Sequence, residues 1–349
     1  MTVLTIKKEN KLIEGLTFDD VLLVPKQGIL QSRKDADISS ELVSGLKLDV
    51  PIVSANMPSV TEWVMATSIY DAGGYGILHR FSSKADSLEE YIYVKETDRD
   101  CGVSLGLNDT EQIPKFYEMG CRLFCLDVAH GDHERVIEFT INFKRSNFGD
   151  AKLIVGNVAT FDGAERLIKA GADAIKVGIG PGAACRTREV TGFGVPQLTA
   201  IIDVATAIYI NNKDVKLIAD GGIKNSGDIV KALAAGADTV MIGSLLAGCN
   251  EAPSPGEYYG SASERVNGHR APEGIHGNVE RKGSVEDVIK ELAWGIRSGI
   301  SYGGATNIEE LRQQAEFIRV TAAGQYESQT RLQQNISVFG ATYELPSLA

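Results

Sequence analysis

The chain carries eight short apolar segments, and the longer segments between them repeat apolar residues at helical spacing. In the linking segments 161–174 (FDGAERLIKAGADA) and 225–239 (NSGDIVKALAAGADT), apolar residues recur every three or four positions and a glycine follows. Each apolar segment therefore predicts a β-strand, and each linking segment predicts an α-helix. The predicted strands are 51–57, 74–80, 101–107, 121–129, 152–159, 174–180, 216–223 and 239–247.

Regular alternation of strands and helices predicts a parallel sheet, because nearly continuous apolar strands are typical of sheets covered on both faces. Eight such units in a row favour closure into a (β/α)8 barrel, the TIM-barrel fold. The alternative, an open doubly wound sheet, would need a glycine-rich dinucleotide fingerprint after its first strand, and SANMPS at 54–59 is not one.

We therefore expect one catalytic domain spanning residues 1–349. Residues 1–50 precede the first predicted strand. Residues 250–349 follow the eighth, and we expect them to form a mobile loop, the last barrel helix and a C-terminal tail rather than a second domain.

Composition and charge narrow the class of partner. An apolar content of 43% over 349 residues indicates a soluble globular protein with a sizeable core. The net charge of -11 disfavours a surface that tracks phosphates, so we expect no nucleic acid, and any anionic ligand needs a local site. No apolar run approaches membrane-spanning length, and the start MTVLTIKKENK lacks an apolar signal segment. We therefore expect no membrane association and a cytoplasmic location.

The five cysteines, at positions 101, 121, 125, 185 and 249, show neither a disulfide framework nor metal-type pairing. Four of them are typical of small buried apolar residues. Cys185 differs because it lies in GIGPGAACRTRE (178–189), a polar loop after the sixth strand whose glycines expose peptide groups to a ligand or cation. The nearby Arg186 and Arg188 would favour the thiolate, the nucleophilic form. Cys185 is thus a candidate nucleophile, with an inert buried thiol as the alternative.

Polar residues also follow other predicted strands, at the end of the barrel where active sites collect. Asp220 ends the seventh strand, where its carboxylate suits two ribose hydroxyls, and glycines 221 and 222 come next. Residues 242–244 (IGS) open onto a helix, and the loops after strands seven and eight are the usual phosphate site of this architecture. Asp127 and Asn157 add polar groups to the same mouth. Many barrels, including flavin-dependent ones, bind phosphate with similar loops, so the pattern alone indicates only a phosphate ligand.

Five motifs together resemble one family, the IMP dehydrogenases and GMP reductases. They are LTFDDVLLVP (16–25), VGIGPGAACRTRE (177–189), IADGGI (218–223), VMIGSLLAG (240–248) and FIRVTAAG (317–324), and they span nearly the whole chain. The resemblance implies a (β/α)8 barrel, usually a homotetramer. It also implies that the loop cysteine attacks C2 of a bound purine monophosphate.

Roles for individual residues follow from the same resemblance. The catalytic group would be Cys185, Thr187 and Glu273. The substrate-binding residues would be Asp220, Gly221, Gly222, Gly243, Ser244, Gly260, Ser261, Arg270 and Gly274. The NADPH contacts would be Arg80, Asp127, Ala129 and Gly180, with Ser32 and Arg33 supplied by a neighbouring subunit. A monovalent cation, K⁺, would be bound at Gly180, Gly182 and Arg188.

The sequence departs from the family pattern at three positions. Ala183 replaces the serine of the family's GPGS, which removes a hydroxyl that would donate to phosphate. Arg186 replaces the first of two threonines, and Pro58 stands where the family usually has an aspartate. These changes bear on ligand affinity and cofactor contacts more than on the fold.

Within the family, the segment after Gly260 resembles the bacterial reductases. Dehydrogenases hydrolyse their covalent intermediate with an Arg-Tyr pair on a long flap, and this chain has no tyrosine between Gly260 and Tyr302. Its RAPEG at 270–274 resembles the reductase pattern, in which the glutamate works with the catalytic threonine. Only residues 81–100 lie where most dehydrogenases insert cystathionine-β-synthase-type regulatory modules. The resemblance therefore implies NADPH-dependent conversion of GMP to IMP and ammonia through a thioimidate on Cys185.

Three other functions stay open at this point. The first is an IMP dehydrogenase without regulatory modules, because dehydrogenases also often carry a glutamate in a Pro-Glu-Gly segment and Glu273 would then be a solvated loop carboxylate. The second is a flavin-dependent barrel oxidoreductase, which a yellow colour of the purified protein would reveal. The third is an inactive nucleotide-binding barrel, which would bind GMP without turnover.

Overall fold

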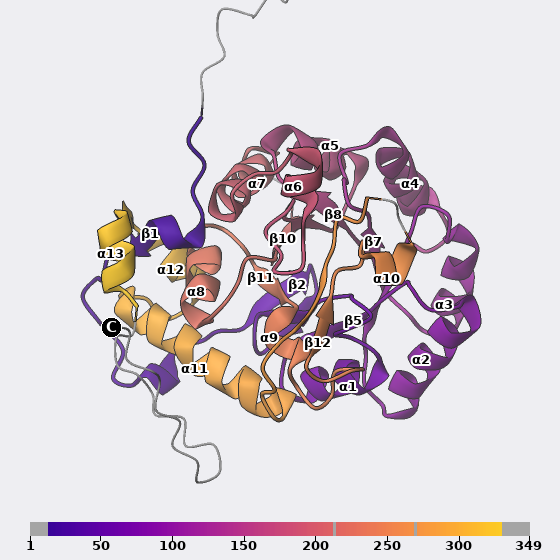
Figure 1. The fold of residues 1–349 in the computed structure, drawn as a ribbon, viewed down its shortest axis with the longest axis horizontal. Helices are drawn as coiled ribbons and strands as arrows, with labels where there is room; N and C mark the ends of the chain where they lie inside the picture. Colours follow the sequence, from indigo (N-terminus) through magenta and orange to yellow (C-terminus); the bar gives the residue numbers. More distant parts are fainter. Residues whose placement is uncertain (1–12, 212–213, 269–270, 330–349) are drawn as a thin grey trace, which may run out of the picture.

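Eight parallel strands close into a barrel in the computed structural model, which describes residues 13–211, 214–268 and 271–329. The strands pair in chain order, and the eighth pairs with the first (Figure 1). They are the eight strands that the apolar segments predict, so the fold is a (β/α)8 TIM barrel. The barrel strands are β4 (Ile52–Ser54), β5 (Tyr75–Leu78), β6 (Gly102–Leu105), β7 (Leu123–Asp127), β8 (Lys152–Val158), β9 (Ala174–Val177), β10 (Lys216–Asp220) and β11 (Thr239–Ile242).

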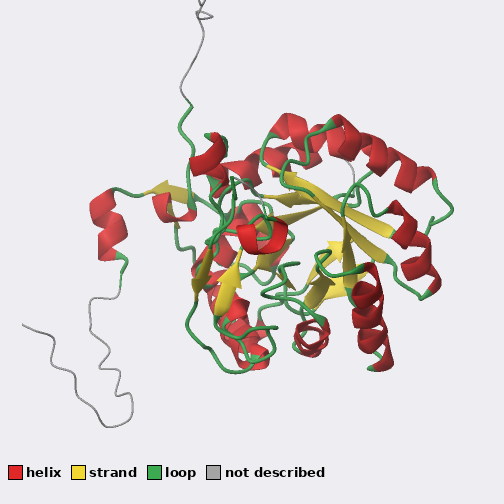
Figure 2. Ribbon diagram, turned by 45° about the vertical axis from the view of Figure 1, so that its right-hand side comes forward, coloured by secondary structure: helices red, strands yellow, loops and turns green. Residues whose placement is uncertain are grey.

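Helices between the strands cover the outside of the barrel (Figures 1 and 2). The covering helices are α1 (Trp63–Asp71), α2 (Lys84–Glu96), α3 (Ile113–Glu118), α4 (Glu134–Arg145), α5 (Phe161–Ala170), α7 (Gln197–Asn211), α8 (Ser226–Ala234) and α11 (Val285–Tyr302). Helix α5 shows why the pattern predicts them. Thr160 caps its start by accepting a hydrogen bond from the Gly163 N–H, and Leu167 and Ile168 are buried. The helix ends at Gly171, whose φ of 100° suits glycine.

The predicted strands are longer than the observed ones at their C-terminal ends. Strand β9 stops before Gly178, which has a φ of 148°, and β10 stops before Gly221, which has a φ of 90°. Such angles are open to glycine and break the extended conformation. The apolar run therefore continues for a few residues beyond each strand, and those residues form the mouth of the barrel.

Residues before and after the barrel pair with each other, which the sequence analysis did not predict. Strand β1 (Val21–Leu23) pairs antiparallel with β14 (Phe317–Arg319). The hairpin of β2 (Ser40–Val43) and β3 (Leu46–Leu48) packs against β10 and β11. Helices α12 (Ile308–Gln314) and α13 (Ala322–Glu327) lie in the C-terminal part, and short 3₁₀ turns lie at Phe18–Asp20, Arg33–Asp35 and Thr110–Gln112.

The predicted loop after β11 contains a hairpin. After the short helix α9 (Ser244–Ala247), strands β12 (Glu257–Tyr259) and β13 (His276–Asn278) pair antiparallel, and α10 (Glu264–Asn267) lies between them. We call residues 257–278 the flap. Strands of three residues are too short to produce a readable alternation of apolar and polar positions, so the sequence pattern did not reveal them.

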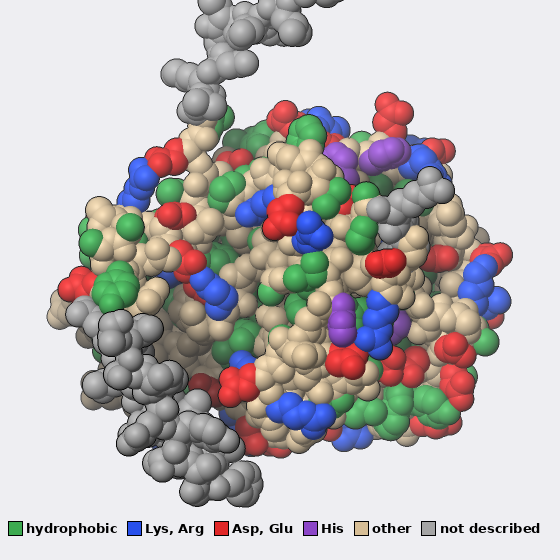
Figure 3. Space-filling view, in the orientation of Figure 1, with side chains coloured by type: hydrophobic (Ala, Val, Ile, Leu, Met, Phe, Trp, Pro, Cys, Tyr) green, Lys and Arg blue, Asp and Glu red, His purple; other side chains and the backbone are tan. Residues whose placement is uncertain are grey.

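The charged side chains on one face of the protein do not separate by sign. Figure 3 shows acidic and basic side chains interspersed over one face, without a continuous basic patch. In the described residues, no helix combines the length and apolar character needed to cross a bilayer.

The aromatic layer between strands and helices should contribute strongly to stability. Phe124 of β7 is fully buried, and its ring lies edge-on to Phe143 of α4 at 5.7 Å between centroids. We expect Phe124→Ala to lower the free energy of unfolding by about 3–5 kcal/mol, because it leaves a cavity in a close-packed core. Urea denaturation measures this. Ile92→Ala on the exposed side of α2 is the control and should change stability by less than about 1 kcal/mol; equal losses would contradict the prediction.

Candidate active site

A cavity of about 590 Å³ opens at the C-terminal ends of the barrel strands. Residues following β4, β5 and β7 to β11 line it, together with residues of the flap. A second cavity of about 280 Å³ adjoins it and shares Pro181, Gly221 and Tyr258 as lining residues. The larger cavity has the size of a typical small-molecule site, at the end of the barrel where TIM-barrel active sites lie.

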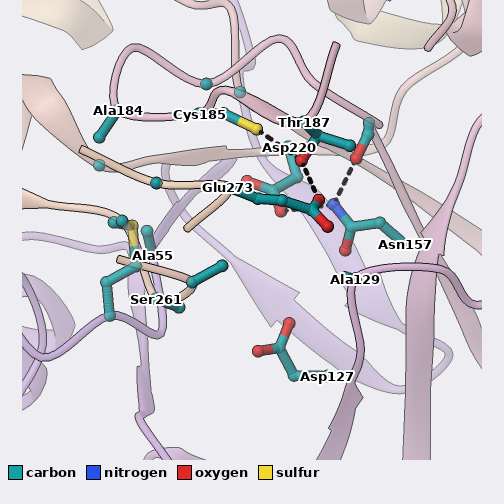
Figure 4. A pocket seen from close by; sticks show the side chains of 18 of the residues that line it. Ala55, Asp127, Ala129, Asn157, Ala184, Cys185, Thr187, Asp220, Ser261 and Glu273 are labelled. Atoms are coloured by element: carbon teal, nitrogen blue, oxygen red, sulfur yellow. Dashed lines mark hydrogen bonds between the residues drawn. The ribbon is translucent and has the colours of Figure 1, made fainter. Parts of the chain in front are cut away.

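Cys185, Thr187 and Glu273 form a chain of hydrogen bonds in the larger cavity (Figure 4). The Cys185 thiol donates to the Thr187 hydroxyl at 3.2 Å, and this hydroxyl donates to Glu273 Oε2 at 2.8 Å. Cys185 lies in the loop between β9 and α6 (Thr187–Thr191), whereas Glu273 comes from the flap. The sequence analysis predicted all three as one catalytic group, and the structure brings them together.

Backbone hydrogen bonds tie the flap to the cysteine loop. The Arg186 N–H donates to the Glu273 carbonyl at 2.6 Å, and the Ile275 N–H donates to the Ala184 carbonyl at 2.9 Å. Gly274 lies in this contact, where an added Cβ would come within 2.9 Å of the Ser263 nitrogen. The close approach of two segments of the flap, at residues 260–263 and at Gly274, therefore requires glycine at 274, in addition to the substrate-binding role that the sequence analysis gave it.

The two arginines beside Cys185 bind elsewhere. Arg186 Nε pairs with Glu189 at 2.8 Å, and Arg188 donates to the carbonyls of Ile179 and Val195 at 3.3 and 2.6 Å. The sequence analysis expected both guanidinium groups to act on the thiol, whereas the thiol's side-chain hydrogen bond goes to Thr187. Spacing along the chain predicted proximity, but the glycine turns of the loop direct Arg188 back onto the loop's own carbonyls.

Arg188 stays a predicted residue of the cation site, where only its backbone carbonyl could be a ligand. A guanidinium is positively charged and has no lone pair to offer a metal ion. The Arg188 carbonyl already accepts a hydrogen bond from the Gly192 N–H at 3.1 Å. Backbone carbonyls at Gly180 and Gly182 are oxygen ligands of the kind that K⁺ binds, so the cation stays a prediction. In the described part of the chain, no three His, Cys, Asp or Glu side chains gather as a metal cluster.

A buried lysine connects two of the predicted ligand-binding carboxylates. Lys176 of β9 places its ammonium 3.0 Å from Asp127 Oδ1 and 2.9 Å from Asp220 Oδ2. Burial alone would raise the pKa of Asp127, but the charge of Lys176 holds that pKa below its usual value. The two carboxylates likewise keep the pKa of Lys176 above its usual value despite burial. Asp127 and Lys176 are therefore both charged at neutral pH.

The sequence analysis missed Lys176, although one signal was present. A lysine within the apolar run AIKVGIG (174–180) has to be buried, and a buried ammonium requires an acidic partner. Asn157, from β8, donates to the same Asp220 oxygen at 2.9 Å. Its own Oδ1 is buried without a hydrogen-bond partner among the described residues, so it can accept from a ligand.

One of the four predicted phosphate residues, Gly260, lines the larger cavity, whereas the other three line the smaller cavity. Gly222, Gly243 and Ser244 lie there, and so does Ala183, which leaves the wall without the expected hydroxyl. The structure adds Tyr258 of the flap, which sequence reasoning missed: a Cβ on Gly243 would come within 2.7 Å of its hydroxyl oxygen. Burial raises the pKa of Tyr258 above its usual value, so the hydroxyl keeps its proton.

Some of the remaining predicted residues line the larger cavity, and others line neither cavity. Arg80 and Ala129 line the larger cavity, and Arg80 Nε donates to the Asp127 carbonyl at 3.2 Å. Gly221, Gly260 and Ser261 line it as well. Ser32 and Arg33 line neither cavity; Arg33 donates to Ser298 of α11 at 3.2 Å. Arg270 lies outside the described residues.

Fold and cavity together define a (β/α)8-barrel protein with a cysteine, a carboxylate pair and a phosphate-type pocket at the C-terminal mouth. Residues 15–331 match the family model described as the IMP dehydrogenase / GMP reductase domain. The chain belongs to the IMP dehydrogenase / GMP reductase family and is an oxidoreductase of purine metabolism.

Two curated relatives and one solved structure illustrate the range of the family. The chain is 33% identical to inosine-5'-monophosphate dehydrogenase of Aquifex aeolicus, over 93% of this chain and 96% of the relative. It is 33% identical to the protein of the same name from Borreliella burgdorferi, over 90% and 96%. The structure of a cysteine-to-alanine variant of GMP reductase from Trypanosoma brucei, in complex with guanosine 5'-monophosphate, matches with a TM-score of 0.84 at 27% identity, over 92% of this chain and 98% of that one.

Proposed function

We propose that the protein is a GMP reductase, which converts GMP and NADPH to IMP, NADP⁺ and ammonia. The observation that carries this proposal is the hydrogen-bond chain from the Cys185 thiol through Thr187 to Glu273. It joins a nucleophile to a carboxylate that can receive and return a proton. The complex of GMP with the structurally similar Trypanosoma brucei reductase supports the choice of substrate.

The first half of the reaction exchanges the amino group at C2 for sulfur. The Cys185 thiol passes its proton to Thr187, whose own proton moves to Glu273, and the sulfur attacks C2 of GMP. The carbon–nitrogen bond then breaks, and the proton returns along the same chain to the amino group, which leaves as ammonia. The product is a thioimidate on Cys185, and the charge of the system is unchanged.

The second half replaces sulfur by hydrogen at C2. NADPH supplies the hydride when it is bound, which is the chemistry that the protein itself lacks. The carbon–sulfur bond breaks, the thiolate regains a proton, and IMP is released. The task of the chain's residues is to hold C2 beside Cys185 and to keep water from the thioimidate. No tyrosine lies between Gly260 and Tyr302 to help activate water.

Binding roles can be assigned on the same basis. Asp220 would bind the ribose, and the loops at Gly222 and Gly243 would bind the phosphate in the smaller cavity. Arg80, Asp127 and the unpartnered Asn157 Oδ1 would contact the dinucleotide, because all three residues line only the larger cavity.

The quaternary structure and location are part of the proposal. We propose a homotetramer, in which Ser32 and Arg33 would contact the dinucleotide of a neighbouring subunit; in their own chain they line neither cavity. We further propose a cytoplasmic enzyme, with K⁺ at the carbonyls of Gly180 and Gly182.

IMP dehydrogenase is the second candidate, because curated relatives at 33% identity carry that name. That reaction would use the same cysteine on IMP with NAD⁺ and would then hydrolyse the thioimidate to XMP. It requires a group that activates water at the flap. Glu273, bonded to Thr187, is the described flap carboxylate in the cavity that could do so.

A nicotinamide absorbance assay separates the two activities. We expect NADPH oxidation with GMP and release of one ammonia per NADPH, because only the reductase reaction consumes the amino group. IMP with NAD⁺ should yield no XMP. Robust NAD⁺ reduction with IMP, together with no reaction of GMP and NADPH, would overturn the proposal in favour of the dehydrogenase.

A further inference from the structure

Lys176 lies in the candidate active site, and the proposed reaction assigns it no role. Its side chain is only 4% exposed, yet it belongs to a barrel strand surrounded by apolar residues. Placing an ammonium there is costly unless it is paired. It has two partners, Asp127 at 3.0 Å and Asp220 at 2.9 Å.

The two partners come from opposite sides of the lysine in the barrel. Strand β9 lies between β8 and β10; Asp220 ends the neighbouring β10, and Asp127 ends β7, two strands away on the other side. Under the proposed function, Asp220 binds the ribose of GMP and Asp127 contacts the dinucleotide. One ammonium therefore contacts both the nucleotide side and the dinucleotide side of the cavity.

The ammonium of Lys176 offsets the repulsion between the carboxylates of Asp127 and Asp220. Since each carboxylate lies about 3 Å from the same nitrogen, the two oxygens are within roughly 6 Å of each other. Without the ammonium, two carboxylates at this separation in a largely buried site would repel, and the pair would retain a proton to higher pH. Asn157 would then be the neutral donor left on Asp220.

We infer that Lys176 is a positioning residue, whose ammonium holds Asp220 and Asp127 in the orientations that bind GMP and the dinucleotide. This inference rests on the proposed function for the identity of the two ligands. Lys176 itself takes no part in bond making. Its raised pKa means that it keeps its proton and cannot act as a base near neutral pH.

The test is the binding of each ligand to Lys176→Met, a variant that keeps the apolar stem and removes the charge. We expect the dissociation constants of GMP and of NADP⁺, measured separately by calorimetry, each to rise about tenfold or more, because a charge-assisted contact on each carboxylate is lost. The control is Lys216→Met. Lys216 lies at the start of barrel strand β10 and also pairs with two carboxylates, Glu41 and Asp214, but it does not line the cavity.

The pH dependence separates positioning from general loss of structure. The ratio of the GMP dissociation constants of Lys176→Met and wild type should rise with pH, because the variant lacks the ammonium that offsets the repulsion between the two carboxylates, and this repulsion grows as they lose protons. Cys185 also lines the cavity, but it is common to both proteins, so its contribution cancels in the ratio. Arg80 stays charged, and burial raises the pKa of Cys125 to about 12 and that of Tyr258 above its usual value.

A second variant keeps the test decisive if Lys176→Met folds poorly. The double variant Lys176→Met with Asp127→Asn removes the repulsion, so it should bind GMP more tightly than the single variant and without the added pH dependence. Lys176→Arg, which keeps the charge, should recover affinity for both ligands. Wild-type affinities for both ligands in Lys176→Met, or equal losses in Lys216→Met, would overturn the inference. Failure of the wild type to bind GMP would instead overturn the proposed function.

Discussion

Cys185→Ala is expected to abolish turnover while leaving GMP binding nearly intact. The rate should fall by roughly 10⁴-fold or more, because the variant lacks the atom that forms the covalent bond to C2. GMP affinity should stay within a few-fold of wild type, since the ribose and phosphate contacts lie on other loops. Nicotinamide absorbance measures the first effect, and calorimetry measures the second. Cys249→Ala, a buried cysteine outside both cavities, is the matched control and should keep full activity.

Covalent labelling gives an independent check on the nucleophile. A 6-chloropurine nucleotide should label Cys185 alone, because burial raises the pKa of Cys121 and Cys125 to about 12 and that of Cys249 to about 11. Those thiols remain protonated at neutral pH and unreactive. Label found by mass spectrometry on one of them, or full activity of Cys185→Ala, would show that the cysteine loop has another role.

Glu273→Gln should slow the overall reaction by roughly a hundredfold or more, the usual contribution of general acid–base catalysis. The substitution preserves shape and removes the group that returns a proton to the leaving ammonia. Hydride transfer is chemically distinct. Incubating the variant with IMP and NADP⁺ without ammonia forms the thioimidate from the other side. The thiol proton can then go to solvent and no leaving group has to be protonated, so NADPH formation in that single turnover should be affected less than the overall reaction. Stopped-flow absorbance measures this partial reaction.

A second flap carboxylate provides the control for Glu273. Glu264→Gln lies on α10 of the same flap and is exposed, so it should leave both rates unchanged. Equal loss of the overall and partial reactions in Glu273→Gln would remove the specific proton role. Unchanged overall turnover would make Glu273 an ordinary solvated loop residue.

The barrel could be predicted from the sequence because its strands are buried on both faces and its helices on one. Those two environments produce a continuous apolar run and a 3.6-residue period, as at 152–159 and 161–174. The pairing of β1 with β14 could not be found in this way. Its two strands have three residues each and lie far apart in the chain, so neither local period nor proximity along the sequence reveals them.

The sequence also revealed only some of the residues of the candidate site. Cys185 was found from the polar loop that holds it, and Thr187 and Glu273 through the family resemblance; their hydrogen bonds depend on a flap whose position no local pattern specifies. The expected effect of Arg188 on the thiol stays a prediction; spacing along the chain did not reveal that its side chain donates to the Ile179 and Val195 carbonyls. Lys176 was missed because its neighbours read as a uniform apolar strand, and its two acidic partners are distant in the sequence.

The backbone contacts between the flap and the cysteine loop also have an evolutionary meaning. Under the proposed function, the attacking group belongs to a barrel loop, whereas the carboxylate that passes the next proton comes from the flap, which main-chain hydrogen bonds at Arg186 and Ile275 join to that loop. Apart from the buried Tyr258 and Tyr259, the flap contributes little to the barrel core. Under the proposed function, changes within these roughly twenty residues would direct one covalent intermediate toward hydride or toward water.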